Sequence, residues 1–209
     1  MNKDWFRRKT WTKKDKKDFF ERLERSRDPF HKSQYLRIQA SYIYKKYPSE
    51  ALFLLQKLEK EFPEESQLAS AYLQMAECFI KLEKYDNAIK YFRLSIEYEK
   101  EQPSFQTRAF IDFPVFIVSH GMVDFYSEIR EILLNSKEKL LFPVDRYYYY
   151  ASLSIIFEYE KNKEKAKTFA IKAINTSSEK CSGFKYHQNI GLVKEDRKIN
   201  SILNRIIRS

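Results

Sequence analysis

Apolar positions along this chain recur with the three-, four- and seven-residue spacing of helices that bury one face. Three small residues, Ala51, Ala88 and Ala166, mark the pattern. Large apolar or aromatic residues lie 16, 13 and 9 positions before each alanine, and apolar or small residues follow 4 and 7 positions after it. The gaps between the markers are 37 and 78 residues, so the second is close to twice the first. This regularity predicts a repeated unit of two amphipathic helices joined by a short turn.

The repeated region divides into four predicted helix pairs. Their expected ranges are 32–65, 69–102, 106–139 and 147–180. The third pair is degenerate because Pro114 stands inside its first helix, where proline removes a hydrogen bond and kinks the chain. Ile129 takes the place of the marker alanine only if a few residues are inserted near Gly121. We therefore expect helices over about 106–119 and 122–136, with a bend or widened turn between them.

Residues 1–31 form a basic N-terminal segment that ends in a helix. Thr12 and Asp15 have the spacing of a capping box, with aspartate in place of the usual glutamate. Phe19 and Leu23 then share one apolar face. We expect this helix to pack on the first pair.

Residues 181–209 consist of an apolar tail segment followed by a strongly amphipathic helix. Counted from Ile199, the apolar positions of that helix fall at i, i+3, i+4, i+7 and i+8, and Arg205 and Arg208 lie on the opposite face. A helix of this kind is expected to cap the last pair and cover its apolar side.

The paired pattern resembles the tetratricopeptide repeat (TPR), a family of helix–turn–helix units of about 34 residues. Ala76 and Ser154 occupy the family's first small position, and the three marker alanines occupy the second, where the helices approach most closely. The resemblance covers residues 32–180. It implies an all-α, right-handed α-solenoid of about four TPR-like helix pairs, with one extra helix at each end.

The resemblance also implies a concave groove lined by the first helix of each pair. The lining, carried over position by position, is Leu36, Ala40, Tyr44, Leu73, Glu77, Arg108, Ile111, Val115, Tyr148, Ile155 and Tyr159. This surface is more apolar than a groove filled with water, which indicates an interaction site. The implied function is that of a non-enzymatic scaffold or adaptor that binds a protein or peptide partner, and Tyr148 is the preferred contact.

The tail segment 181–193 is too apolar for a free linker and carries no acidic residue. Two interpretations stay open. The groove either binds an apolar stretch or amphipathic helix of another protein, or it is filled by this segment, and a displaceable segment would act as an autoinhibitory plug. The residues that would fill the groove are Phe184, Tyr186, His187, Ile190 and Leu192.

The positive charge of the chain is concentrated at its ends. Of a formal net charge of +10, residues 1–27 carry +6 and residues 194–209 carry +3. The candidate basic patch consists of Arg7, Arg8, Lys9, Lys13 and Lys14. Neighbouring aromatic residues can stack on unpaired bases or pack under the first helix. Acidic residues interrupt the patch, so a nucleic-acid-associated module is the second hypothesis and self-association the third.

Composition excludes several classes of protein. A hydrophobic content of 43% excludes wholesale disorder, and three glycines are too few for a Gly-rich phosphate loop. No run of apolar residues is long enough to span a membrane, and the first residues lack the apolar core of a secretory signal. We therefore expect a cytoplasmic protein.

Motifs for catalysis and metal binding are absent from the sequence. There are three histidines and two cysteines, with no HExxH or CxxC, so no metal, no cofactor and no catalytic residue is expected. Cys181 and His187 could form a nucleophile pair. A buried thiol and a hydrogen-bonded histidine are the preferred interpretation of these two residues.

Overall fold

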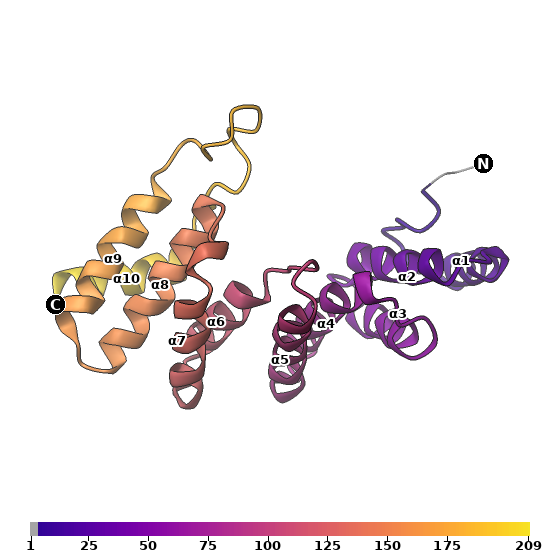
Figure 1. Ribbon diagram of the computed structural model, residues 1–209, viewed down its shortest axis with the longest axis horizontal. Helices are drawn as coiled ribbons and strands as arrows, with labels where there is room; N and C mark the ends of the chain where they lie inside the picture. Colours follow the sequence, from indigo (N-terminus) through magenta and orange to yellow (C-terminus); the bar gives the residue numbers. More distant parts are fainter. Residues whose placement is uncertain (1–3) are drawn as a thin grey trace. The chain divides into compact units, whose positions relative to one another are not determined.

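The computed structural model describes residues 4–209, which form an all-helical structure without strands in that range (Figure 1). The α-helices are α1 (Lys13–Arg25), α2 (Pro29–Ile43), α3 (Pro48–Glu61), α4 (Glu65–Lys81), α5 (Tyr85–Glu101), α6 (Ala109–His120), α7 (Tyr126–Asn135), α8 (Pro143–Tyr159), α9 (Lys163–Ser177) and α10 (Arg197–Arg208), with short 3₁₀ turns η1 (Val123–Phe125) and η2 (Lys137–Lys139). The chain divides into two compact units, of which unit 1 ends at Ala109 and unit 2 covers Phe110–Ser209. The all-α class is therefore confirmed, and the division falls within the third predicted pair.

Neighbouring helices pack as the predicted pairs: α2 with α3, α4 with α5, and α8 with α9. Ala51, Ala88 and Ala166 are each 0% exposed, because they lie where the second helix of a pair approaches the first. Two serines also join helices within a pair. The Ser95 hydroxyl donates to the carbonyl of Ala69 at 2.9 Å, and the Ser154 hydroxyl donates to the carbonyl of Ala166 at 2.8 Å. Because the two helices of each pair approach closely at these positions, only small side chains fit there.

Replacing Ala166 with leucine should lower the free energy of unfolding by about 1–3 kcal/mol, because the larger side chain must push α9 away from α8. The same shift would break the hydrogen bond from Ser154. Denaturant titration followed by circular dichroism measures the loss. The control is Lys167→Leu, which adds a similar side chain at the next, exposed position. An equal effect of both substitutions would contradict close packing at Ala166.

The N-terminal helix begins at the predicted capping box. The backbone N–H of Asp15 donates to the Thr12 hydroxyl at 3.2 Å, and the N–H of Thr12 donates to the Asp15 carboxylate at 2.9 Å. Phe19 is 0% exposed. Its ring lies 5.3 Å from that of Trp5 and 5.4 Å from that of Trp11. The N-terminal aromatic residues therefore pack against α1.

The third pair departs from regular geometry where the sequence predicts it. Helix α6 begins at Ala109, continues through Pro114 and ends at His120. Gly121 follows with φ of +64°, a left-handed conformation that L side chains rarely adopt. The turn η1 then precedes α7. The predicted widened turn is present, although both helices are shorter than expected.

Helix α10 packs across α8 and α9 in unit 2 (Figure 1). Its apolar stripe, Ile199, Leu203 and Ile206, is 2%, 0% and 1% exposed. These residues share a core with Tyr147 and with the alanines of α9. The predicted capping helix is therefore confirmed, and it completes the apolar core of unit 2.

Candidate partner-binding site

The predicted groove residues of unit 2 lie mainly beneath α10. Val115, Tyr148 and Ile155 are partly buried against the core to which α10 contributes. The Tyr148 hydroxyl donates to Asp196 at 3.5 Å, and the Tyr147 hydroxyl donates to Asn200 at 2.7 Å. We call the surface of α6 and α8 that carries these predicted groove residues the inner face of unit 2. This face already holds one amphipathic helix, the chain's own α10.

The tail segment does not fill the groove, which corrects one of the two open interpretations. Phe184, Tyr186, His187 and Ile190 are exposed, and Leu192 is half-buried. The segment forms a tight loop with Gly183 and Gly191 at positive φ, and its backbone polar groups need water or local partners. A helix satisfies its own backbone, so α10 is the better occupant of an apolar surface.

The groove assignment is also wrong at three buried positions. Leu36 and Ala40 are 0% and 1% exposed, because α2 packs against both α3 and α4 and its 36/40 stripe is enclosed. Ile111 in α6 is likewise 0% exposed. The remaining unit 1 residues of the predicted lining are half-buried and reach the surface: Tyr44, Leu73, Glu77 and Arg108.

An open part of the inner face remains where α7, α8 and α10 meet. A cleft of about 200 Å³ is lined there by Tyr126, Ile155, Glu158, Tyr159, Ile202, Arg205 and Ile206. The rings of Tyr126 and Tyr159 meet edge to face with their centroids 5.3 Å apart. Tyr159 is 56% exposed, so an incoming side chain can reach it. Two predicted groove residues, Ile155 and Tyr159, therefore line a real depression.

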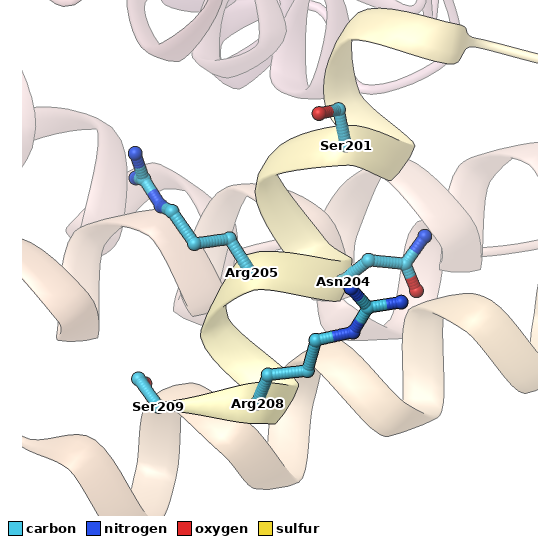
Figure 2. A pocket seen from close by; sticks show the side chains of 5 residues that line it. All are labelled: Ser201, Asn204, Arg205, Arg208 and Ser209. Atoms are coloured by element: carbon cyan, nitrogen blue, oxygen red, sulfur yellow. The ribbon is translucent and has the colours of Figure 1, made fainter.

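The outward side of α10, beside this cleft, carries side chains that donate hydrogen bonds (Figure 2). The residues on this open side are Ser201, Asn204, Arg205, Arg208 and Ser209. Within the described residues neither Arg205 nor Arg208 pairs with an acidic side chain, and both are exposed. We call this surface the arginine face of α10. Arg205 belongs both to this face and to the cleft.

The chemistry of the cleft and the arginine face suits a ligand with an apolar and an anionic part. Burial, together with the neighbouring Tyr159, raises the pKa of Tyr126, so its hydroxyl stays protonated and can donate a hydrogen bond. The carboxylate of Glu158 lines the cleft and repels an anion there. The two arginines attract carboxylate or phosphate groups outside it.

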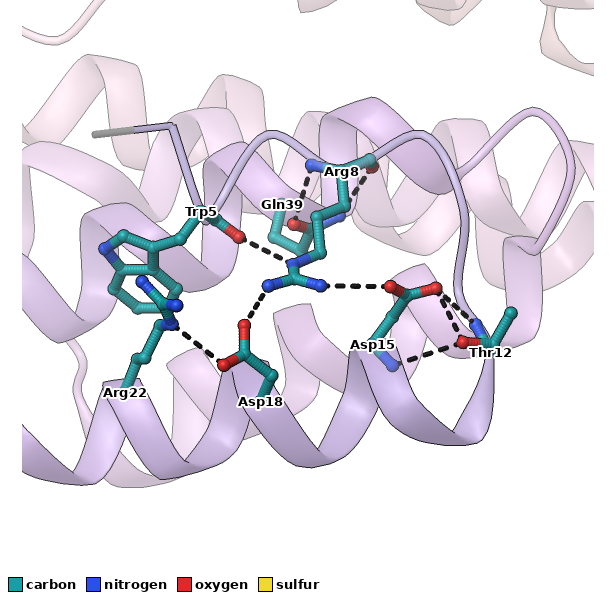
Figure 3. Close-up of polar contacts among 7 residues, drawn as sticks. All are labelled: Trp5, Arg8, Thr12, Asp15, Asp18, Arg22 and Gln39. Carbon is teal, nitrogen blue, oxygen red and sulfur yellow. Dashed lines mark hydrogen bonds and ion pairs between the residues drawn. The ribbon is translucent and has the colours of Figure 1, made fainter. Parts of the chain in front are cut away.

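Two of the five residues of the N-terminal basic patch, Arg7 and Arg8, form ion pairs, and Figure 3 shows those of Arg8. Arg8 contacts Asp15 at 2.9 Å, pairs with Asp18 and donates to the carbonyl of Trp5 at 3.0 Å. Arg7 pairs with Asp4 at 2.6 Å. Only the lysines of the predicted patch present exposed side chains without an ion pair among the described residues: Lys9, Lys13 and Lys14. The acidic residues of α1 thus offset the charge of Arg8, whereas the three lysines keep theirs.

Asp15 makes the start of α1 sensitive to acid. Hydrogen bonds from the backbone N–H and the hydroxyl of Thr12 lower the pKa of Asp15 to about 2 from an ordinary value of 3.8. Because the pKa of Asp15 is lower in the folded than in the unfolded chain, the stabilisation that its carboxylate provides is complete above about pH 4 and is lost as the pH falls towards 2.

We expect Asp15→Asn to lower the melting temperature at pH 5 and to flatten its decline between about pH 4 and 2. Thermal melts by circular dichroism check this, with Asp124→Asn as the exposed control; parallel curves for Asp15→Asn and wild type would contradict it.

Cys181 is exposed, so the expectation of a buried thiol is wrong at that position. It follows Lys180, a few residues after α9 ends at Ser177, where the chain enters an exposed loop. Cys78 is buried, and burial raises the pKa of its thiol to about 12.

Across residues 4–209 the structure brings together no group of three or more histidine, cysteine, aspartate or glutamate side chains that could hold a metal ion. None of the helices in that range is long and apolar enough to cross a membrane.

Comparison of this chain with protein-family models, with curated proteins and with solved structures found no match. Sequence reasoning placed Arg205 and Arg208 on the outward side of the capping helix but did not assign them to a site. It missed Tyr126, because the spacing of the degenerate third pair gave no reason to bring α7 to the groove.

Proposed function

We propose that this chain is a non-enzymatic protein-interaction module of the tetratricopeptide type, with right-handed winding of its helix pairs, which binds an acidic segment of another protein through unit 2. The observation that carries the proposal is the shared position of Arg205, which joins a cleft lined by tyrosine and isoleucine side chains to a cationic surface. The buried marker alanines support the tetratricopeptide resemblance. A small scaffold or adaptor in the cytoplasm is the corresponding cellular role.

The ligand places one apolar side chain in the cleft beside Tyr126 and Tyr159. Its acidic side chains then meet Arg205 and Arg208, which are three residues apart and so about 4.5 Å apart along the axis of α10. Acidic residues three or four apart on a ligand helix have a matching spacing. The negative charge of Glu158 disfavours a carboxylate inside the cleft. The apolar side chain of the ligand therefore enters the cleft, and its acidic side chains stay outside.

The expected binding free energies give the cleft and the arginine face different roles. Burying a large apolar side chain contributes about 1.5–3 kcal/mol, whereas an exposed ion pair contributes about 0–1 kcal/mol. The cleft therefore supplies most of the affinity. The arginines mainly speed association and select acidic partners. Binding should accordingly survive moderate salt, since apolar burial is not screened.

A random peptide library displayed on phage tests the proposal with the full chain as bait. We expect enriched peptides to combine one large apolar residue with acidic residues one helical turn away. Two variants should weaken binding of the selected peptides: Tyr159→Ser, which removes an apolar contact of the cleft, and the double substitution Arg205→Glu with Arg208→Glu, which replaces attraction of the acidic residues by repulsion. The matched control makes the same change of charge at exposed α9 positions, Lys163→Glu with Lys167→Glu.

Each outcome assigns or rejects the site. Weaker binding in both variants, with the control unaffected, supports the proposal. Binding that is lost in Leu73→Asp but kept in the unit 2 variants assigns recognition to the half-buried α4 surface of unit 1. Selection of no peptide family at all rejects a peptide-binding function.

Nucleic-acid binding is the second candidate function, favoured by the hydrogen-bond donors of the arginine face. It predicts an affinity for single-stranded oligonucleotides that falls steeply with salt, because phosphate contacts release counterions. The double substitution Arg205→Glu with Arg208→Glu would flatten that dependence.

Self-association through α10 would bring two cationic faces together, and these would repel each other. We therefore expect a molecular mass that is independent of concentration, as sedimentation would measure.

A further inference from the structure

The connection between α9 and α10 is closed by its own hydrogen bonds. The backbone N–H of Ser182 donates to the carbonyl of Gln188 at 2.8 Å, and its hydroxyl donates to the carbonyl of His187 at 2.7 Å. That hydroxyl also accepts a hydrogen bond from the N–H of Phe184 at 3.2 Å. We call residues 182–191 the α9–α10 loop. It is a defined structure rather than a slack tether.

The loop is fastened to the start of α8. The N–H of Val144 donates to the carbonyl of Gly191 at 2.8 Å. Gly191 has φ of +65°, and a Cβ added there would lie 2.5 Å from the Cβ of Phe142. The ring of Phe142 lies 5.4 Å from that of Phe184. Glycine is therefore required at this contact, which holds the loop in place.

The anchored loop presents apolar side chains to water. Tyr186 is 83% exposed, Ile190 48% and Phe184 42%. Leu141, which precedes the anchoring Phe142, is 62% exposed. The loop projects beyond the α8–α9 pair (Figure 1). Exposed apolar side chains on a hydrogen-bonded projection add little to the stability of the core and are typical of an interaction site.

The charges between Glu179 and Glu195 have one sign. Lys180, Lys185 and Lys194 lie in or beside it, and the sequence between Lys180 and Lys194 contains no acidic residue. Glu179, which precedes this stretch, pairs with Arg146 at 2.7 Å. The surface that bears the apolar side chains is therefore cationic and complements an anionic partner.

We propose that the α9–α10 loop, together with Leu141, inserts into the interfacial layer of a membrane that contains anionic lipids. A convex apolar projection needs no matching pocket in a fluid lipid surface. Tyrosine and phenylalanine favour the boundary between headgroups and acyl chains, and lysines at the rim attract anionic headgroups.

Base stacking is a poorer match to the same residues. The ammonium of Lys185 lies over the Tyr186 ring, 5.4 Å from its centroid, and so covers one of its faces. Ile190 and Leu141 have no ring to offer a base. Membrane insertion of the α9–α10 loop is independent of the peptide site proposed for unit 2. Neither the loop residues nor Leu141 line the cleft or the arginine face.

Sedimentation of the full chain with vesicles tests the inference. The vesicles are phosphatidylcholine alone, or phosphatidylcholine with about a third phosphatidylserine, at low ionic strength. We expect roughly tenfold or greater preference for the anionic vesicles. The double variant Tyr186→Ser with Ile190→Ser should weaken binding by about tenfold or more. The matched control is Leu134→Ser in α7, where the leucine is 55% exposed and far from the loop in sequence.

A second variant separates the loop's shape from its composition. Gly191→Ala keeps every apolar and charged side chain but places a Cβ against Phe142, so it should also weaken vesicle binding. The inference is overturned if the wild type does not bind anionic vesicles, or if the loop variants bind as well as the Leu134→Ser control. Binding of a single-stranded oligonucleotide, lost in the loop variants while vesicles stay unbound, would likewise overturn it in favour of nucleic acid.

Discussion

Replacing Leu203 with alanine will lower the free energy of unfolding of unit 2 by about 2–5 kcal/mol. Leu203 is 0% exposed and lies in the middle of the apolar stripe of α10. Its core includes Ala151, Ala170 and Ala173, and small side chains cannot move in to fill the space that leucine vacates. A cavity that cannot collapse places the cost towards the upper end of the range.

The position of the two tryptophans allows this loss to be assigned to unit 2. Trp5 and Trp11 both lie in unit 1, so tryptophan fluorescence reports on that unit while circular dichroism reports on both. In urea, Leu203→Ala should shift the dichroism transition and leave the fluorescence transition in place. Ser201→Ala, on the exposed side of the same helix, should change stability by less than about 0.5 kcal/mol. A loss below about 1 kcal/mol for Leu203→Ala would contradict the seating of α10 described above.

Replacing Phe19 with alanine will destabilise unit 1 by about 3–5 kcal/mol. Phe19 is 0% exposed and stands at the centre of an aromatic cluster. Its ring lies within 5.4 Å of those of Trp5, Trp11 and Phe20. The substitution removes these ring contacts together with the buried area, and aromatic pairs each add about 0.5–1.5 kcal/mol.

Tryptophan fluorescence should register the Phe19 substitution directly, with a shift of the urea midpoint and a change of the native spectrum. Phe53→Ala is the matched control, because Phe53 is 52% exposed and should cost only about 1 kcal/mol. If the Phe19 variant unfolds at the wild-type midpoint, the N-terminal aromatic residues are not held against α1. They would then be available for stacking on bases.

The helix pairs could be predicted from the sequence because their markers are local. Close approach of two helices demands a small residue, and Ala51, Ala88 and Ala166 recur at a nearly constant period for that reason. The capping box at Thr12 and the stripe of α10 are likewise local patterns that one helix displays by itself. The structure confirms each of these features.

The candidate site could be predicted only in part, because it depends on how helices meet. Leu36 and Ala40 have the right positions for a groove, but α2 turns their stripe towards α3 and α4. Tyr126 joins the cleft across a widened turn whose geometry no periodicity encodes. The apolar content of the tail segment by itself predicts that the segment is buried. Its exposure follows from the local hydrogen bonds of Ser182 and from the contact of Gly191 with Phe142, which joins residues far apart in the sequence.

Because α10 covers the inner face of unit 2, an external helix must compete with α10 for that surface. A helix tethered to the surface that it covers acts as a ligand at a millimolar effective concentration. An external helix of ordinary affinity therefore cannot displace α10, and recognition passes to the side that α10 turns outward. Substitutions at Ser201, Asn204, Arg205 or Arg208 could then change the preferred partner while the packing beneath stays the same. Unit 2 thus separates the residues that maintain its fold from those that can vary with a new ligand.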